Sequence, residues 1–272
     1  MDDKYFLAQI KDKIQQCQNQ YCETHTGFLD IHQQSIAHAL TKYEHDIQCI
    51  FYGGFEDAER RVLLCLPDYV NAEGFASAVG HLPKSDEGQE PAWVQDLEEC
   101  QPLRVIRARK AKGSRDLTHR DYLGSLIGLG IKRDMIGDIL VRNDGADIII
   151  LKEIEDYLLF NYGKAGRTEL TLEAVPISEL IIPAGMSKEM KDTVASLRLD
   201  NIVSSAFGLS RSKASEAINH GIVFVNNVEC QKVDYNVAEG DKIVLRGKGK
   251  AYLREVGGRS KKGRQYVTFE IF

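Results

Sequence analysis

Apolar residues at helical spacing mark two helices near the start of the chain, and two apolar runs follow them. The apolar positions are Phe6, Leu7, Ile10 and Ile14 within residues 2–17, and Ile31, Ile36, Ala39 and Leu40 within residues 29–43. Residues 47–55 and 60–69 are apolar runs separated by the polar stretch 56–59. We therefore expect residues 1–82 to form two helices followed by a β-hairpin.

The middle of the chain alternates between strand-like and helix-like patterns. Strand patterns cover residues 103–110, 135–142, 148–152 and 168–177, and helix patterns cover 118–130 and 153–163. The resulting order, β-α-β-β-α-β, predicts a ferredoxin-like (RRM-like) domain over residues 92–182, with two helices on one face of an antiparallel sheet. The polar residues 83–91, which are bounded by prolines, are predicted to be a linker.

The last part of the chain begins with a predicted turn region, residues 181–194, and continues into two short helices. The first helix has a core stripe of Leu199, Ile202, Val203 and Ala206. Ser210 is a good N-cap for the second helix, and Gly221 marks its end. A hairpin turning at 226–227 follows, then a strand over 242–247 and two strands around a basic loop within 254–272. Residues 188–272 are thus the third predicted domain of an α+β protein.

Charge is distributed unevenly along the chain. The formal net charge is −5, but Lys and Arg number 7 against 18 Asp and Glu in residues 1–101, 13 against 12 in residues 102–187, and 15 against 10 in residues 188–272. A basic C-terminal part attached to an acidic front suggests that the partner of the C-terminal part is negatively charged.

Several other functions have weak support in the sequence. The acidic, amphipathic start lacks the features of a signal peptide, and no apolar run is long enough to span a bilayer, so we expect a cytoplasmic protein with no membrane partner. The six cysteines are expected to be reduced thiols. Cys17, Cys22 and His25 lack a second ligand pair, and the row His25, His32, His38 and His45 lacks carboxylates at ligand spacing. We predict no metal, no cofactor and no small-molecule substrate.

The helix at 118–130 carries two notable features. Thr118 and Asp121 fit a capping pattern, in which each side chain satisfies amides at the helix start. Gly124 and Gly128 lie one turn apart and indicate close backbone packing, either within the protein or against RNA. A basic cluster surrounds this helix and suggests a surface for a polyanion; its members are Arg104, Arg107, Arg109, Lys110, Lys112, Arg115, Arg120, Lys132 and Arg133.

The second helix of the C-terminal part starts with positive charge. Arg211 and Lys213 lie in its first turn, where the helix dipole disfavours each cation by about 0.3–1 kcal/mol. An anion bound at the free amides of the helix start would offset this cost. On this reading, removing Arg211 should slightly stabilise the free protein.

Residues 198–241 resemble the RNA-binding module of the fourth small-subunit ribosomal protein. The matching motif residues are Arg198-Leu199-Asp200, Ser210-Arg211, Lys213-Ala214, Gly221, Val225-Asn226 and Gly240-Asp241. In that family the two helices and the hairpin hold RNA. The resemblance therefore implies RNA-contacting roles for Arg198, Ser210, Arg211 and Lys213, while Asp200 is expected to orient an arginine.

The whole chain resembles the bacterial YlmH family. The stretches "FYGGFEDAERR" and "THRDYLGSLIGLGIKRDMIGDI", followed by the C-terminal module, occur in that family's order. The resemblance implies a non-enzymatic RNA-binding protein that acts with the large ribosomal subunit and tRNA in quality control of stalled nascent chains, and whose genes neighbour those of cell division. Further candidate RNA contacts are Lys248, Lys250, Lys261, Lys262, Arg120, Lys132 and Arg133.

Two alternatives remain open at this point. Some pseudouridine synthases carry the same module, but their catalytic aspartate stands in a Gly-Arg-Leu-Asp context, which is absent here. A protein-protein adaptor that uses the acidic first segment, for example in cell division, is compatible with RNA binding.

Overall fold

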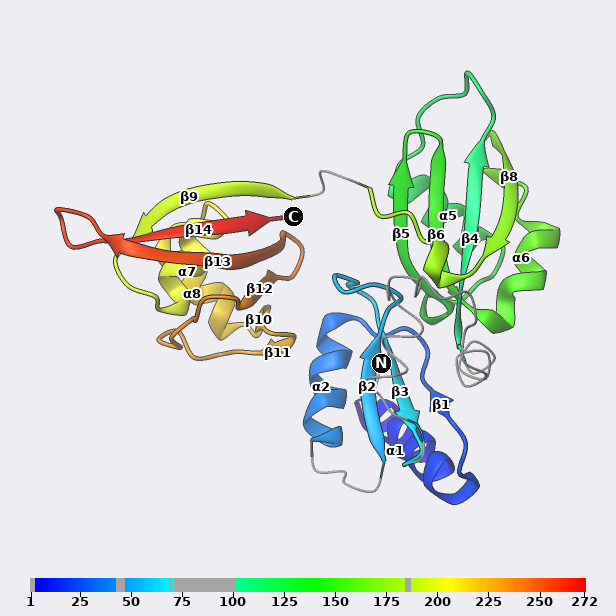
Figure 1. The fold of residues 1–272 in the computed structure, drawn as a ribbon, viewed down its shortest axis with the longest axis horizontal. Helices are drawn as coiled ribbons and strands as arrows, with labels where there is room; N and C mark the ends of the chain where they lie inside the picture. The colour runs from blue at the N-terminus through cyan, green and yellow to red at the C-terminus, as the bar shows by residue number, and fades with distance from the viewer. Residues whose placement is uncertain (1–2, 43–46, 69, 71–100, 184–186) are drawn as a thin grey trace, which may run out of the picture. The chain divides into compact units, whose positions relative to one another are not determined.

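The computed structural model describes residues 3–42, 47–68, 70, 101–183 and 187–272, and the chain forms two compact units, Met1–Pro183 and Ala184–Phe272. Two sequence expectations, the histidine at His45 and the linker at residues 83–91, lie outside the described residues. The predicted segments 1–82 and 92–182 fall in the same unit. Figure 1 shows the elements of both units.

The first part of unit one contains the two predicted helices and the predicted hairpin. Its elements are α1 (Asp3–Gln20), β1 (Thr24–His25), α2 (Ile31–Thr41), β2 (Gln48–Tyr52) and β3 (Val62–Leu66). The three strands form a sheet in the order β1-β3-β2, of which β1 was not predicted. The apolar stripe of α1 is buried, and Ile10 and Ile14 pack with Leu63 and Cys65 of β3.

The central part has the predicted succession of strands and helices. Its main elements are β4 (Leu103–Lys110), α5 (His119–Gly128), β5 (Ile136–Arg142), β6 (Gly145–Leu151), α6 (Glu155–Asn161) and β8 (Thr168–Val175). A short strand β7 (Lys164–Ala165) pairs with β8, and the antiparallel sheet runs β5-β6-β4-β8-β7. Short 3-10 turns, η1 (Arg133–Met135), η2 (Lys152–Ile154) and η3 (Ile177–Glu179), lie between these elements.

The two faces of the central sheet are covered by different parts of unit one. Helices α5 and α6 cover one face, where Tyr122 and Leu158 pack with Ile106. On the opposite face, Val105 belongs to a buried cluster with Val62 of the first hairpin; the other members from the two parts include Phe28, Tyr52, Leu64, Leu66, Leu103, Ile149 and Leu151. This shared core explains why the first two predicted segments form one unit.

Arg60 joins the first hairpin to the central sheet. Its guanidinium donates hydrogen bonds to the carbonyl oxygens of Phe28 (2.7 Å), Arg133 (3.2 Å) and Ile136 (3.0 Å). Asp138 of β5 accepts in return from the backbone amides of Glu59 (2.6 Å) and Arg60 (3.1 Å). The hairpin loop and the start of β5 therefore hold each other by side-chain-to-backbone hydrogen bonds in both directions.

The start of α5 confirms the predicted capping pattern of Thr118 and Asp121. The Asp121 carboxylate accepts from the backbone N–H and the hydroxyl of Thr118, both at 2.8 Å, and from Arg115 Nη2 at 2.7 Å. These bonds, led by the backbone amide, lower the pKa of Asp121 to about 2. The Thr118 side chain accepts in return from the backbone N–H of Asp121, and its hydroxyl also donates to the Asp121 carboxylate.

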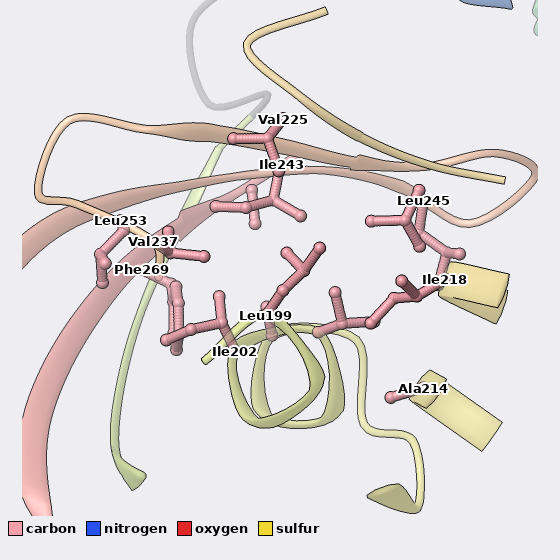
Figure 2. Packing of buried hydrophobic residues seen from close by; sticks show 14 of the residues in the cluster. Leu199, Ile202, Ala214, Ile218, Val225, Val237, Ile243, Leu245, Leu253 and Phe269 are labelled. Atoms are coloured by element: carbon pink, nitrogen blue, oxygen red, sulfur yellow. The ribbon is translucent and has the colours of Figure 1, made fainter. Parts of the chain in front are cut away.

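Unit two is one antiparallel sheet packed against two helices. Its elements are β9 (Lys188–Val194), α7 (Leu199–Ala206), α8 (Arg211–Asn219), β10 (Val223–Val225), β11 (Val228–Glu229), β12 (Lys242–Leu245), β13 (Gly249–Arg259) and β14 (Gln265–Ile271). Figure 2 shows Leu199 and Ile202 of α7 pointing toward Ile243 and Phe269 of the strands. The predicted helices, the Ser210 cap and the hairpin turn with positive φ at 226–227 are confirmed.

The strand β9 corrects one expectation. Residues 181–194 were predicted to be a turn region, but Lys188–Val194 pairs with β14 over seven residues, at one edge of the sheet β11-β10-β12-β13-β14-β9. Charged residues dominate this segment, so its pattern carries little strand signal. Its strand conformation depends on β14, which lies about seventy residues further along the chain.

Replacement of Arg60 by alanine should destabilise unit one by about 2–3 kcal/mol, because three carbonyls lose a charged donor. Equilibrium denaturation measures this loss. Arg167→Ala, at an exposed arginine, is the matched control and should change stability by less than about 0.5 kcal/mol. Equal effects of the two substitutions would contradict the bridging role of Arg60.

Replacement of Asp121 by asparagine should lower stability at neutral pH, while the RNA affinity of the folded protein stays near normal. Because the folded pKa is depressed, the carboxylate stabilises the protein above its unfolded pKa of about 4. This contribution disappears as pH falls toward 2. The difference in unfolding midpoint between wild type and Asp121→Asn should therefore shrink over that range. A difference independent of pH would disprove the role of the charge.

Candidate nucleic-acid interface

The start of α8 places three of the predicted RNA-contacting residues together. Ser210 is the N-cap, and its hydroxyl accepts from the backbone N–H of Lys213 at 3.3 Å. Arg211 is the first residue of the helix, and the side chains of Arg211 and Lys213 are both exposed. Gly221, with φ of +68°, follows the helix end as predicted. This arrangement presents a hydroxyl, two cations and the helix-start amides on a short stretch of backbone.

Asp200 of α7 fixes two of the predicted cations. Its carboxylate is 3% exposed and accepts from Arg198 Nε at 3.2 Å and from Arg211 Nη2 at 2.7 Å. Burial alone would raise the pKa of Asp200, but the hydrogen bonds from Arg211 and Arg198 outweigh it and hold the pKa below its usual value. The expectation that Asp200 orients an arginine is confirmed, and it orients two.

This ion pair changes the meaning of the positive charge at the start of α8. The sequence alone suggested that Arg211 carries an uncompensated dipole penalty. In the structure the Asp200 carboxylate lies within hydrogen-bond distance of Arg211, so the free protein already contains a compensating negative charge. The Arg211 side chain is still 62% exposed, which leaves part of its guanidinium accessible to a second anion.

The basic lysines after the second helix fall into two groups. Lys248 is exposed in the turn between β12 and β13, and Lys261 and Lys262 are exposed in the loop between β13 and β14. Lys250 differs: it is 6% exposed, and its ammonium lies 4.5 Å from the centroid of the Phe272 ring. This geometry argues against Lys250 as an RNA contact, because strand β13 turns its side chain onto an aromatic ring.

The three predicted contacts of the central domain also differ from one another. Arg120 on α5 and Lys132 just after it are exposed. Arg133 donates to the carbonyl oxygens of Ile136 (2.6 Å) and Gly137 (3.3 Å). Burial, together with the nearby charge of Arg60, lowers the pKa of Arg133 to about 10. This geometry favours a structural role for Arg133, against its assignment as an RNA contact.

Most of the basic cluster in the central domain is paired with acids. The pairs are Arg104–Glu155 (3.4 Å), Arg107–Asp147 (3.0 Å), Arg109–Glu173 (3.5 Å), Lys110–Asp116 (2.5 Å) and Arg115–Asp121 (2.7 Å). Asp147 is fully buried and also lies 2.5 Å from Arg142. Asp147 and Glu173 come from neighbouring strands and Glu155 from α6, whereas Asp116 and Asp121 lie close to their partners in sequence. The cluster therefore forms a much smaller basic surface than predicted. Within the part of the chain that the structure describes, the exposed members without such a pair are Lys112, Arg120 and Lys132.

The predicted glycine packing in α5 is also corrected. A Cβ atom placed at Gly124 or Gly128 would meet no other heavy atom of the described residues within 4 Å. Both glycines are exposed on the helix surface. The space beside them is therefore open, and close packing within the chain does not explain them.

The candidate metal ligands Cys17 and His25 have different surroundings. Cys17 is buried in α1, while His25 Nε2 lies 3.6 Å from Glu153. Within the described residues, no three His, Cys, Asp or Glu side chains gather in a way that could hold a metal ion. In the same part of the chain, no helix has the length and apolar character needed to cross a membrane.

Known protein families match both the central domain and the C-terminal module. The family described as "Putative RNA-binding domain in YlmH" matches residues 103–179, and the S4 domain matches residues 197–243. "Ribosome-associated protein quality control protein P2" of Bacillus subtilis (strain 168) is 32% identical over 269 residues, which are 99% of this chain and 95% of the relative. The chain belongs to the YlmH family.

The YlmH-family match covers β4 to η3, and the S4 match contains Arg198, Ser210, Arg211 and Lys213 but ends before Lys248. A solved structure titled "Cell division protein ylmH from Streptococcus pneumoniae" is 26% identical and covers 65% of this chain and 92% of its own, with a TM-score of 0.45. Lys248, Lys261 and Lys262 lie beyond the S4 match, in the turns that connect β12, β13 and β14.

Replacement of Arg211 by alanine should lower the stability of unit two by about 1 kcal/mol, because the buried Asp200 loses one of its two charged donors. This sign is opposite to the one expected from the helix dipole alone.

Asp200→Asn should weaken RNA binding although Asp200 is buried, because it frees both arginines. Since the pKa of Asp200 is depressed, its stabilising effect is present above pH about 4 and is lost as pH falls below that value.

Thermal unfolding without RNA measures the first effect, and a binding titration measures the second. Arg211→Lys retains the charge without the planar fork and should fall between wild type and alanine. An increase in stability for Arg211→Ala would show that the dipole, and not Asp200, dominates at this helix start.

Proposed function

We propose that this protein is a non-enzymatic RNA-binding protein that binds ribosomal RNA, tRNA or both on the large ribosomal subunit, in quality control of stalled nascent chains. The name of the Bacillus relative supports the ribosomal role, and the two matched domains support RNA as the ligand. The observation that carries the proposal is the pairing of Arg198 and Arg211 by one buried carboxylate at the starts of α7 and α8.

The physical argument is one of preorganisation. Arginine normally loses side-chain freedom when it contacts a phosphate, but Asp200 already holds both arginines. The amides at the start of α8 and Lys213 add further positive potential. An RNA phosphate therefore meets donors that need little reordering, and Ser210 keeps the helix start in place.

The same carboxylate argues against the pseudouridine synthase alternative. Asp200 is the aspartate of the Arg-Leu-Asp stretch, and it is buried and bonded to two arginines. A nucleophilic aspartate needs access to its substrate, and this one is occupied in a structural pair. We therefore assign Asp200 a positioning role.

We further propose that the central domain is of the ferredoxin-like type and supplies a weaker RNA contact through Arg120 and Lys132. The strand order β5-β6-β4-β8 and the two helices on one face support the fold assignment. The exposed cations and the open space beside Gly124 and Gly128 support contact with an RNA backbone. Two linked weak sites gain affinity through effective concentration.

Replacement of Lys213 by alanine should weaken RNA binding and reduce the magnitude of the salt slope by about one unit, as expected for the loss of one phosphate contact. Lys213 is an exposed cation in the first turn of α8, so its removal should leave stability unchanged or raise it by about 0.3–1 kcal/mol. Binding to large-subunit particles across a salt series is the measurement, and Arg167→Ala is the control. An unchanged salt slope would remove Lys213 from the interface.

The ribosomal part of the proposal has a direct test in cells. Crosslinking the protein to RNA and sequencing the attached fragments should recover large-subunit ribosomal RNA, tRNA or both. Crosslinks confined to messenger RNA would disprove the ribosomal assignment while leaving RNA binding intact.

A further inference from the structure

The sheet of unit two has a second face that the S4 match does not explain. Leu253, Val267 and Phe269 point into the core with α7 and α8. Alternate residues on the same strands point to the opposite face, and among them Tyr266 is 51% exposed. A large aromatic side chain on the outer face of a sheet is a common platform for nucleic-acid bases.

Tyr266 lies at the edge of a hollow in this outer face. The hollow is lined by Lys191, Thr193, Glu255, Gly257, Tyr266 and Thr268, from the three neighbouring strands β9, β13 and β14. Gly257 helps to shape it, because a Cβ atom there would come within 3.3 Å of the Tyr266 side chain. We refer to this site as the Tyr266 hollow.

Exposed cations lie in the loop beside the hollow, and a carboxylate lies inside it. The loop at the end of β13 and β14 is basic, with exposed Arg259, Lys261, Lys262 and Arg264. Arg264 reaches back toward the hollow, where its Nε donates to the hydroxyl of Thr193 at 3.0 Å. Inside the hollow, the Glu255 carboxylate accepts from the Thr268 hydroxyl at 3.3 Å. Lys191 also lines the hollow, but its ammonium is paired with Glu189 at 3.2 Å. A phosphate is therefore attracted more strongly to the loop than to the hollow.

We propose that the Tyr266 hollow holds an unpaired RNA base whose flanking phosphates lie against the cations of the β13–β14 loop. This inference rests on the proposed function, because it takes the strand to be RNA. The ring of Tyr266 stacks on the base, and stacking accepts any base. Glu255 and the nearby hydroxyls select among bases, because a carboxylate accepts hydrogen bonds from exocyclic amino groups such as that of cytosine.

A purely structural role for Tyr266 makes different predictions. An aromatic side chain facing a glycine on the neighbouring strand can serve to cover that glycine and stabilise the sheet. In that case Tyr266→Ala would lower stability and weaken the binding of every RNA equally. The proposed role weakens only the binding of RNAs that offer an unpaired base.

The experiment compares two RNAs with equal numbers of phosphates, a blunt-ended duplex and a shorter duplex with an oligocytidine tail. Full-length Tyr266→Ala should bind the tailed RNA about five- to a hundredfold more weakly than wild type, which is the effect of losing one stacked base. It should bind the blunt-ended duplex like wild type, with the same salt slope for both RNAs. Tyr266→Phe retains the ring and should bind within about twofold of wild type.

Controls separate the possible failures. Tyr5→Ala, at a tyrosine of α1 that is 62% exposed, should bind both RNAs like wild type. Unchanged binding of the tailed RNA by Tyr266→Ala, or equal weakening for both RNAs, overturns the hollow as a base site while RNA binding by the wild type stands. Failure of the wild type to bind either RNA overturns the proposed function as well.

A second comparison tests the selection by Glu255. A tail of cytidines should bind more tightly than a tail of uridines, because uracil presents a carbonyl where cytosine presents an amino group. Glu255→Gln should reduce this preference, since a neutral amide serves both bases. Equal affinity of the wild type for the two tails overturns the assignment of Glu255 as an acceptor for the base.

Discussion

A charge that leaves water needs a partner, and this constraint decides which cations of the protein remain available to RNA. Asp147 is fully buried and takes up Arg107 and Arg142. Asp200 is nearly as buried, but its two arginines stay about half exposed. The pairing at Asp147 neutralises two arginines inside a sheet. The pairing at Asp200 instead holds two arginines in a fixed position at the protein surface.

The pairing at Asp200 also connects the two helices of the S4 region. Asp200 lies in the first turn of α7, and Arg211 is the first residue of α8. One carboxylate therefore connects the starts of the two helices. Below them, Leu199 and Ala214 belong to the same buried cluster. Apolar packing therefore sets the distance between the helices, and the ion pair sets the direction of the arginines. Both are needed for the arginines to converge on one phosphate.

Local patterns predicted the helices and their ends well, because the information is contained within a few residues. Examples are the stripe from Leu199 to Ala206, the cap at Ser210 and the αL glycine at Gly221. Strand β9 was missed because its conformation depends on pairing with β14.

The pairing of two cations in the basic cluster was missed for the same reason. Glu173 and Asp147 reach Arg109 and Arg107 only through the sheet. Counting charges along the sequence does not show partners that the fold brings together. The buried position of Lys250 likewise depends on a ring, Phe272, at the far end of a neighbouring strand.

The two sheets of the protein use their faces differently, and this difference limits where each can meet RNA. In the central domain the helices cover one face, and the first hairpin covers the apolar part of the other, where Val62 packs with Val105. An RRM places its stacking aromatics on such a face, which here is filled by the protein itself. This is why the RNA contact that we propose for this domain lies on the helix surface around Arg120. In unit two, α7 and α8 pack against one face through residues such as Phe269, and the opposite face presents Tyr266 to solvent. An aromatic base platform is thus open in the S4-containing unit, where the neighbouring loop also supplies the positive charge that a single strand requires.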